Sequence, residues 1–297
     1  MESTILVAGG TGNLGGRIIN ELLRNGGKVR AVVRSDSATD KIEKLEKSGA
    51  EVVRVDMNNV SQLTKACEGI SCVVSALAGL RDVIVDTQSK LLDAAVAAGV
   101  SRFIPSDFSS DFTQLADGDN RNFDLRREFH QYLDNSPIRA TSIFNGAFAE
   151  LLTYNIPFLD MKKKTVGYVE DADWKVDFTT MDDTAAFTAE AALDSETPRF
   201  LRIASFQISA NELAPLASEI AGEDFRAYPM MGRNELAEKN KKDRAADPDG
   251  ENQLYSKWQQ AQYMHSMFTS QMKELDNERY ADLKWTSARD LLENTRK

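Results

Sequence analysis

The chain has 297 residues, and its 46 acidic side chains outnumber its 36 Lys and Arg side chains, for a formal net charge of −10. A hydrophobic fraction of 42% and a charged fraction of 28% are ordinary for a globular protein, which argues against disorder and fibrous structure. The acidic balance also argues against a nucleic-acid partner, because the largest basic patch is only Lys162-Lys163-Lys164.

Cysteine and histidine are too few and too scattered to predict a metal centre. Cys67 and Cys72 lack metal-ligand spacing, and His130 and His265 lie far apart in the sequence. No apolar stretch approaches the roughly 18 residues that a membrane span needs, and the N-terminal segment lacks the basic region of a secretory signal. We therefore expect a cytoplasmic protein that acts without metal or membrane.

Residues 1–150 alternate short apolar runs with amphipathic stretches, as do βαβ units that build a parallel sheet. The predicted strands are Thr4–Ala8, Lys28–Val33, Glu51–Asp56, Cys72–Ala76, Arg102–Ser106 and Ala140–Asn145. The predicted helices are Leu14–Asn25, Lys41–Ser48, Val60–Glu68, Asp82–Ala98 and Phe123–Asn135, and the first four are each followed by a glycine. The expected fold class is α/β, a Rossmann-type doubly wound parallel sheet.

After residue 150 the regular alternation fades, which predicts a smaller α+β lobe over 151–297, partly interwoven with a dinucleotide-binding domain over 1–150. Expected elements are an extended segment over Gly167–Phe178, a helix over Asp182–Leu193, a strand over Arg199–Ala204 and a helix over Ser209–Ala221 with a capping box. The polar stretch Asn234–Asn252 is expected to turn at Pro248. A last helix, between Leu254 and Met272, carries a Met and aromatic face that either packs in the core or covers a ligand cleft.

A glycine-rich segment, Gly9-Gly10-Thr11-Gly12-Asn13-Leu14-Gly15, joins the first predicted strand to the first helix. Its glycines allow a tight turn, close approach of the main chain to a pyrophosphate and close packing of helix on strand. The helix N-terminus would then direct N–H groups at the phosphates. The alternative is a merely tight turn, but a glycine pattern between strand and helix favours dinucleotide binding.

The end of the second predicted strand indicates which dinucleotide binds. Here the sequence reads Arg34-Ser35, followed by Lys41, where an NAD site usually has a carboxylate. An arginine can hold a 2′-phosphate through two parallel hydrogen bonds, so NADP(H) is the expected cofactor unless Arg34 is simply a solvated surface residue. Asp56 and Met57 follow the third strand. Either they border the adenine, or Asp56 caps the following loop.

The sequence resembles the NmrA-like group of atypical short-chain dehydrogenases, which includes the isoflavone-reductase-like enzymes. The resemblance covers nearly the whole chain. Its matching segments are Val7-Ala8-Gly9-Gly10-Thr11-Gly12-Asn13-Leu14-Gly15, Val33-Arg34-Ser35, Arg102-Phe103-Ile104-Pro105-Ser106-Asp107-Phe108, Phe144-Asn145-Gly146-Ala147-Phe148, Asp177-Phe178-Thr179 and Arg279-Tyr280-Ala281-Asp282-Leu283-Lys284-Trp285. The Pro-Ser-Asp-Phe and Tyr…Lys-Trp segments are more specific to this group than the glycine turn is.

The resemblance implies an NADP-binding Rossmann domain and a C-terminal lobe that together form a substrate cleft. Ala76 and Leu77 would line the cofactor after the fourth strand. Ser106 would lie near the nicotinamide, and Asn145 beside it would form the floor of the substrate pocket with Phe148. The simpler alternatives are that Ser106 caps a helix and that Phe148 belongs to the core.

The chain departs from the reductases of this group at one position. Ordinary short-chain dehydrogenases use a Tyr-x-x-x-Lys pair that is missing here, and the spacing of Tyr280 and Lys284 in the C-terminal segment is interpreted as coincidence. The group's reductases instead use a lysine in the helix after the fifth strand, and that position falls on Arg126, or on Arg127 if the alignment shifts by one. With a pKa above about 12 an arginine cannot exchange a proton, but it can polarise a carbonyl.

His130 lies one helical turn beyond Arg126 and could supply a proton, although a histidine at such a position is more often a surface residue. Two functions remain open. The first is an NADPH-dependent reductase of a small aromatic or carbonyl-bearing molecule, in which Arg126 and Ser106 serve catalysis. The second is a catalytically silent NADP-sensing regulator that acts through protein partners. A sugar-nucleotide epimerase is a weaker third, because the Tyr-Lys pair is missing.

Overall fold

The computed structural model describes residues 4–154 and 156–294, and it shows the expected α/β architecture. Six parallel strands form the main sheet in the order β3-β2-β1-β4-β5-β6, which is the doubly wound arrangement. Their bounds are β1 Thr4–Ala8, β2 Lys28–Arg34, β3 Glu51–Val55, β4 Cys72–Ser75, β5 Arg102–Ile104 and β6 Arg139–Ala140. The predicted fold class is therefore confirmed.

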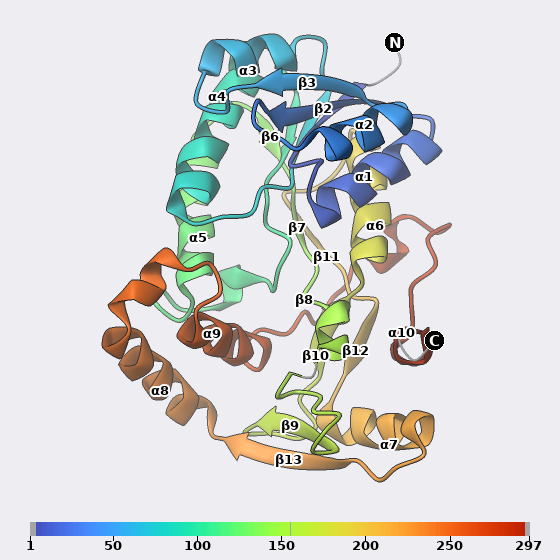
Figure 1. Cartoon of the computed structure of the whole chain (residues 1–297), viewed down its shortest axis with the longest axis vertical. Coiled ribbons are helices and arrows are strands. Elements are labelled where there is room, and N and C mark those ends of the chain that lie inside the picture. The colour runs from blue at the N-terminus through green and yellow to red at the C-terminus, as the bar shows by residue number, and fades with distance from the viewer. Residues whose placement is uncertain (1–3, 155, 295–297) are drawn as a thin grey trace. The chain divides into compact units, whose positions relative to one another are not determined.

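Helices cover both faces of this sheet (Figure 1), with α1 and α2 on one face and α3 and α4 on the other. Their bounds are α1 Asn13–Arg24, α2 Thr39–Lys47, α3 Val60–Cys67 and α4 Gln88–Ala97. Gly26, Gly49, Gly69 and Gly99, which follow these helices, all have positive φ, as the predicted helix ends require. The predicted helix over Asp82–Ala98 differs in its first part, because Asp82–Thr87 forms a π-helical turn (η1) ahead of α4.

The chain forms two compact units that are interleaved in sequence. The first unit contains the residues up to Phe108 together with Leu125–Ile143 and Thr184–Leu201, and the second contains Ser109–Asp124, Phe144–Asp183 and the residues from Arg202 onward. Four elements contain residues of both units: α5 Arg121–Leu133, α6 Met181–Leu193, β7 Ser142–Phe144 and β11 Phe200–Arg202. The chain therefore passes between the units several times on either side of residue 150.

The second unit is built from short strands, single-turn helices and four α-helices. Its strands are β8 Ala147–Phe148, β9 Thr165–Val169, β10 Val176–Thr179, β12 Phe206–Ile208 and β13 Arg226–Met231, and its short helices are η2 Phe112–Gln114, η3 Ala149–Thr153, η4 Pro248–Asn252 and η5 Asn277–Arg279. Its α-helices are α7 Ala210–Ala221, α8 Arg233–Ala246, α9 Lys257–Met267 and α10 Ala288–Asn294. The predicted capping box of Ser209 and Glu212 is present at the start of α7.

Two details of the sequence interpretation are corrected. The single strand expected over Ala140–Asn145 is divided, since β6 joins the main sheet and β7 pairs with β11. Most of the polar stretch Asn234–Asn252 is helix α8, although its expected turn at Pro248 is present as η4. The apolar face expected between Leu254 and Met272, in and around α9, is buried at Trp258, Phe268 and Met272 and half-buried at its other positions, as core packing predicts. What was not expected is that the polar side chains of Gln259, Gln262, His265 and Ser266 are buried as well.

Candidate cofactor and active site

The glycine turn lies where β1 meets α1 in the first unit, and its glycines are required by main-chain contacts. Gly9 has φ +89, and a Cβ atom there would lie 2.4 Å from the carbonyl oxygen of Ala76, at the end of β4. A Cβ atom on Gly15 would lie 2.3 Å from the carbonyl oxygen of Gly9. Neither position accepts a side chain without movement of the main chain, so the turn keeps helix, strand and loop in close contact.

The first turn of α1 is suited to an anion. Gly12 is the N-cap residue and has no side chain to accept hydrogen bonds from the first N–H groups of the helix, and the first turn contains no acidic residue. Asn13 accepts a hydrogen bond from Nε of Arg17 at 2.9 Å, which brings a guanidinium to the same end of the helix. Thr11 and Leu14 lie half-buried in the turn itself. These groups fit a dinucleotide pyrophosphate.

Arg34 is the last residue of β2, and its side chain is 73% exposed. Its Nε lies 3.5 Å from Oδ1 of Asp36, a surface ion pair that is too weak to hold the side chain against a phosphate. Ser35 follows Arg34 on the surface, and Lys41 is exposed in the first turn of α2. Their contact with a 2′-phosphate stays a prediction, which the exposure of all three residues permits.

Asp56 and Met57 directly follow β3. Oδ1 of Asp56 accepts the N–H of Asn58 at 2.9 Å, so the capping alternative is realised. Met57 packs against the core of the first unit. Contact of either residue with an adenine stays a prediction.

The ends of β4 and β5 are joined through Ser106. Its Oγ donates to the carbonyl oxygen of Leu77 at 2.5 Å, and its N–H donates to Oε1 of Gln88 at 2.9 Å. Ala76 continues the line of β4, because its N–H donates to the carbonyl oxygen of Ala8 at 2.9 Å. Ser106, Leu77, Ala76 and the glycine turn therefore lie along the carboxyl ends of β1, β4 and β5, where ligands bind to sheets of this kind.

Helix α5 adds Arg126 to the same part of the first unit. Nε of Arg126 donates to the carbonyl oxygen of Ser106 at 3.0 Å, so the two predicted catalytic residues are in direct contact. Arg127, the position that a shifted alignment would select, is half-buried. His130 is buried rather than on the helix surface, and its Nε2 lies 2.6 Å from Oδ2 of Asp107.

Asp107 lies in the Pro-Ser-Asp-Phe segment, but nothing in the sequence predicts a role for it. The carboxylate is fully buried, and it also accepts a hydrogen bond from Oγ of Ser142 at 2.6 Å. Burial acts to raise the pKa of Asp107, but the charge and hydrogen bond of His130, the hydrogen bond of Ser142 and the charge of Arg126 outweigh it and lower that pKa below its usual range. Asp107 is therefore a buried carboxylate that stays ionised near neutral pH.

Asn145 and Phe148 belong to the second unit. The main-chain N–H of Asn145 donates to the carbonyl oxygen of Ser109 at 3.0 Å, and its carbonyl oxygen accepts Oγ1 of Thr179 at 2.6 Å. Phe148 is half-buried in β8, directly before η3. Their roles at a nicotinamide and a substrate stay predictions.

The described part of the chain holds neither a metal-ligand cluster nor an ionised cysteine. Among residues 4–154 and 156–294 there is no group of three or more His, Cys, Asp or Glu side chains that could hold a metal ion. None of the helices in these two ranges has the length and hydropathy of a membrane span. Burial raises the pKa of the Cys67 thiol to about 12 and that of Cys72 to about 11. Neither cysteine is therefore an ionised nucleophile near neutral pH.

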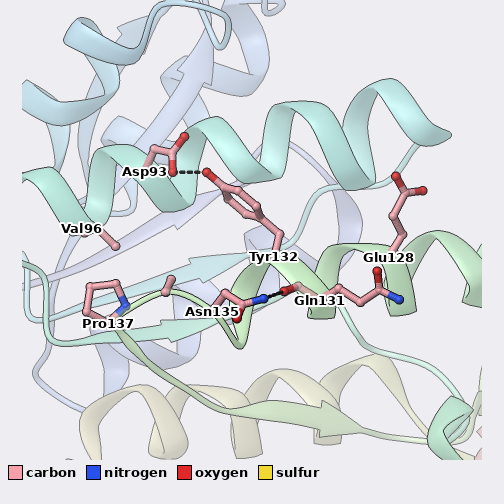
Figure 2. Close-up of a pocket in the computed structure, with 8 residues that line it drawn as sticks. Asp93, Val96, Glu128, Gln131, Tyr132, Asn135 and Pro137 are labelled. Atoms are coloured by element: carbon pink, nitrogen blue, oxygen red, sulfur yellow. Dashed lines mark hydrogen bonds between the residues drawn. The ribbon is translucent and has the colours of Figure 1, made fainter.

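A separate pocket of about 490 Å³ lies between α4 and α5 (Figure 2). Oη of Tyr132 donates to Oδ1 of Asp93 at 2.5 Å across it, and Val96, Glu128 and Pro137 also line it. None of its lining residues is among the predicted site residues. The candidate site is therefore the strand-end region around Gly9, Ser106 and Arg126, and not this pocket.

The family profile described as "NmrA-like family" matches residues 1–278. The chain belongs to the NmrA-like family. Pinoresinol reductase 1 of Arabidopsis thaliana is 30% identical to this NmrA-like protein over 255 residues, which cover 80% of each chain. An isoflavone reductase homolog of Lupinus albus is 27% identical over 258 residues, which again cover 80% of each chain. The predicted family is thus confirmed.

Solved structures show the same fold over 99% of this NmrA-like protein. The structure of AtPrR2 with NADP+ and (+)-pinoresinol has a TM-score of 0.81 at 23% identity and is covered over 99% of its length. The complex of leucoanthocyanidin reductase with NADPH from Vitis vinifera has a TM-score of 0.81 at 19% identity, with the same coverage. At this level of identity the likeness supports the fold alone.

Proposed function

We propose that this protein is an NADPH-dependent reductase of a small aromatic or carbonyl-bearing molecule. The observation that carries the proposal is the contact of Arg126 with Ser106, beside a glycine turn that has no room for side chains. Two relatives that align with 80% of the chain are named as a reductase and a reductase homolog, which supports the same function. Among the described residues, no contact favours the alternative of a silent regulator acting through protein partners.

The residues around the glycine turn fit NADPH, because a Cβ atom would fill the cradle at Gly9 or Gly15 and the first turn of α1 offers donors without an acidic side chain. Gly9 to Gly15 and the start of α1 would hold the pyrophosphate, and Arg34 with Lys41 the 2′-phosphate. Ala76 and Leu77 would border the nicotinamide side. When bound, NADPH supplies a hydride for the reduction.

Arg126 supplies electrostatic stabilisation and not proton transfer. A guanidinium presents several N–H donors and a positive charge, so it can donate hydrogen bonds to an oxygen that becomes negative as a carbonyl is reduced. The carbonyl oxygen of Ser106 fixes Nε and so restricts the side chain. A lysine at this position could exchange a proton as well, which is the chemical difference between this chain and the reductases it resembles.

The proposal is tested by NADPH oxidation over a panel of aromatic ketones, quinones and enones. We expect turnover of at least one class, and a fall in kcat of about 100-fold or more for Arg126→Met with the Kd for NADPH unchanged. Arg126→Lys serves as the matched control, because it keeps a cation at the same place. Tight binding of NADPH without turnover on any member of the panel would contradict the reductase proposal and support the regulator.

Cofactor choice gives a second prediction. Arg34→Asp places a carboxylate where the 2′-phosphate is expected, so NADPH should bind roughly 10- to 100-fold more weakly, equivalent to about 1.4–2.8 kcal/mol, while NADH binding is retained. Titration of both cofactors by fluorescence measures the ratio. Lys47→Asp, an exposed change at the far end of α2, is the charge-matched control. An unchanged ratio of the two affinities in Arg34→Asp would show that this residue does not contact the 2′-phosphate.

A further inference from the structure

We propose that Asp107 and His130 are positioning residues that hold Arg126 and Ser106 in the arrangement used for catalysis. This inference rests on the proposed reductase function and extends it to two residues that were not assigned a catalytic role by the reductase proposal. Both lie in the first unit, as do Arg126 and Ser106.

The geometry consists of two parallel contacts between a helix and the end of a strand. Arg126 and His130 are one helical turn apart on α5, and Ser106 and Asp107 are consecutive residues after β5. Arg126 contacts the carbonyl oxygen of Ser106 at 3.0 Å, and His130 contacts the carboxylate of Asp107 at 2.6 Å. Residues four apart lie on the same face of a helix. The contact of His130 with Asp107 therefore holds α5 in the rotation that lets Arg126 reach the carbonyl oxygen of Ser106.

The pair is also held by Ser142, whose Oγ lies 3.3 Å from Nε2 of His130. Oγ of Ser142, in β7, donates to Oδ2 of Asp107 at 2.6 Å and receives a hydrogen bond from Nη1 of Arg199 at 2.6 Å. The imidazole of His130 packs near the Phe200 ring, with centroids 6.4 Å apart. Asp107 and His130 therefore have little freedom, and the strand end and the helix are joined by a rigid contact.

A buried carboxylate is costly to the fold unless its charge is compensated, and a pair of apolar residues would fill the same space at less cost. Asp107 is fully buried and directly follows Ser106. Arg126 is bonded to the carbonyl oxygen of the preceding residue, Ser106, and its charge is one of the causes that lower the pKa of the Asp107 carboxyl. Holding a long, flexible arginine in one orientation lowers the entropy that is lost when it binds an oxygen in the transition state. We infer that the buried charge serves this purpose.

Two variants of His130 separate positioning from proton transfer. His130→Gln keeps a side-chain N–H that can donate to Asp107, whereas His130→Phe keeps the ring volume without a donor. A positioning role predicts that kcat falls at least tenfold in His130→Phe and stays within about threefold of wild type in His130→Gln, with KM and the Kd for NADPH unchanged in both. Gln131→Phe, a similar change at the exposed position of α5 next to His130, is the control expected to keep wild-type kcat.

A readout without turnover keeps this inference separate from the reductase proposal. Nitrogen-15 NMR of the Arg126 Nε–H, which is bonded to Ser106, should show slow exchange with water in the wild type and exchange at least tenfold faster in Asp107→Asn and His130→Phe. Unchanged exchange in both variants would overturn the positioning role, as would a His130→Gln variant as inactive as His130→Phe. If the exchange changes as expected but no substrate is turned over, the positioning stands and the reductase proposal fails. If Asp107→Asn does not fold, the two His130 variants decide.

Discussion

Replacing Arg121 by methionine is expected to lower the free energy of unfolding by about 3–5 kcal/mol, because it removes a buried guanidinium that donates to four buried or partly buried carbonyl oxygens. The Arg121 guanidinium donates to the carbonyl oxygens of Gly250, Glu251, Gln253 and Leu254, at 3.0–3.2 Å. It also lies over the Trp258 ring, with Cζ 4.9 Å from the ring centroid. One buried side chain thus joins the start of α5 to the loop before α9.

Arg244→Met is the matched control for this experiment. Arg244 also lies over the Trp258 ring, at 5.1 Å, and pairs with Glu251, but its side chain is more exposed and no carbonyl bond from it is seen among the described residues. We expect a loss of about 1 kcal/mol or less for this variant. Urea unfolding followed by circular dichroism measures both. Equal losses would show that the contact with the Trp258 ring, and not the four carbonyl bonds, carries the stability.

Gly15→Ala is expected to weaken NADPH binding by roughly 100-fold or more, equivalent to about 2.8 kcal/mol. The added methyl group would lie 2.3 Å from the carbonyl oxygen of Gly9, so either α1 must move away from β1 or the turn must open. Both movements shift the N–H groups that are expected to contact the pyrophosphate. A fluorescence titration with NADPH measures the loss, and circular dichroism checks that the variant is folded.

Gly232→Ala is the control for this substitution. Gly232 is the N-cap residue of α8, just as Gly12 is of α1, but a Cβ atom there meets no heavy atom within 4 Å. The variant should bind NADPH as the wild type does. A folded Gly15→Ala protein with wild-type affinity would show that the glycine turn is not the pyrophosphate site.

The sheet and its first four helices could be predicted because their signals are local. Buried strands such as β1 and β4 are short apolar runs, and each intervening helix is followed by a glycine with positive φ. Helix α8 was missed for the opposite reason. Only Leu236 and Asn240 of its fourteen residues are buried, so its sequence has no apolar periodicity to indicate a helix.

The candidate site also has one part that could be predicted from the sequence and one part that could not. The glycine turn could be predicted from the sequence because its chemical requirement lies within seven consecutive residues. The contact of Asp107 with His130 could not, since it joins residues 23 apart and depends on the rotation of α5 against the end of β5. The buried amides of α9 are similar: Nε2 of Gln259 donates to Oδ1 of Asn120, which is 139 residues away. Polar burial of this kind depends on tertiary packing, which no local pattern reports.

Interleaving of the two units limits how this chain can be divided or recombined. Helix α6 belongs mostly to the first unit, although it follows residue 180. The carbonyl groups of Ala191 and Ala192 at its end, and that of Asp194 directly after it, accept hydrogen bonds from the buried guanidinium of Arg102 in β5. The side chain of Glu190 accepts one from Asn25. A gene fragment ending near residue 150 would therefore encode a sheet whose Arg102 has lost its acceptors. The first unit alone therefore cannot be exchanged between genes by one crossover; it must be inherited with the two segments of the second unit that interrupt it, 109–124 and 144–183.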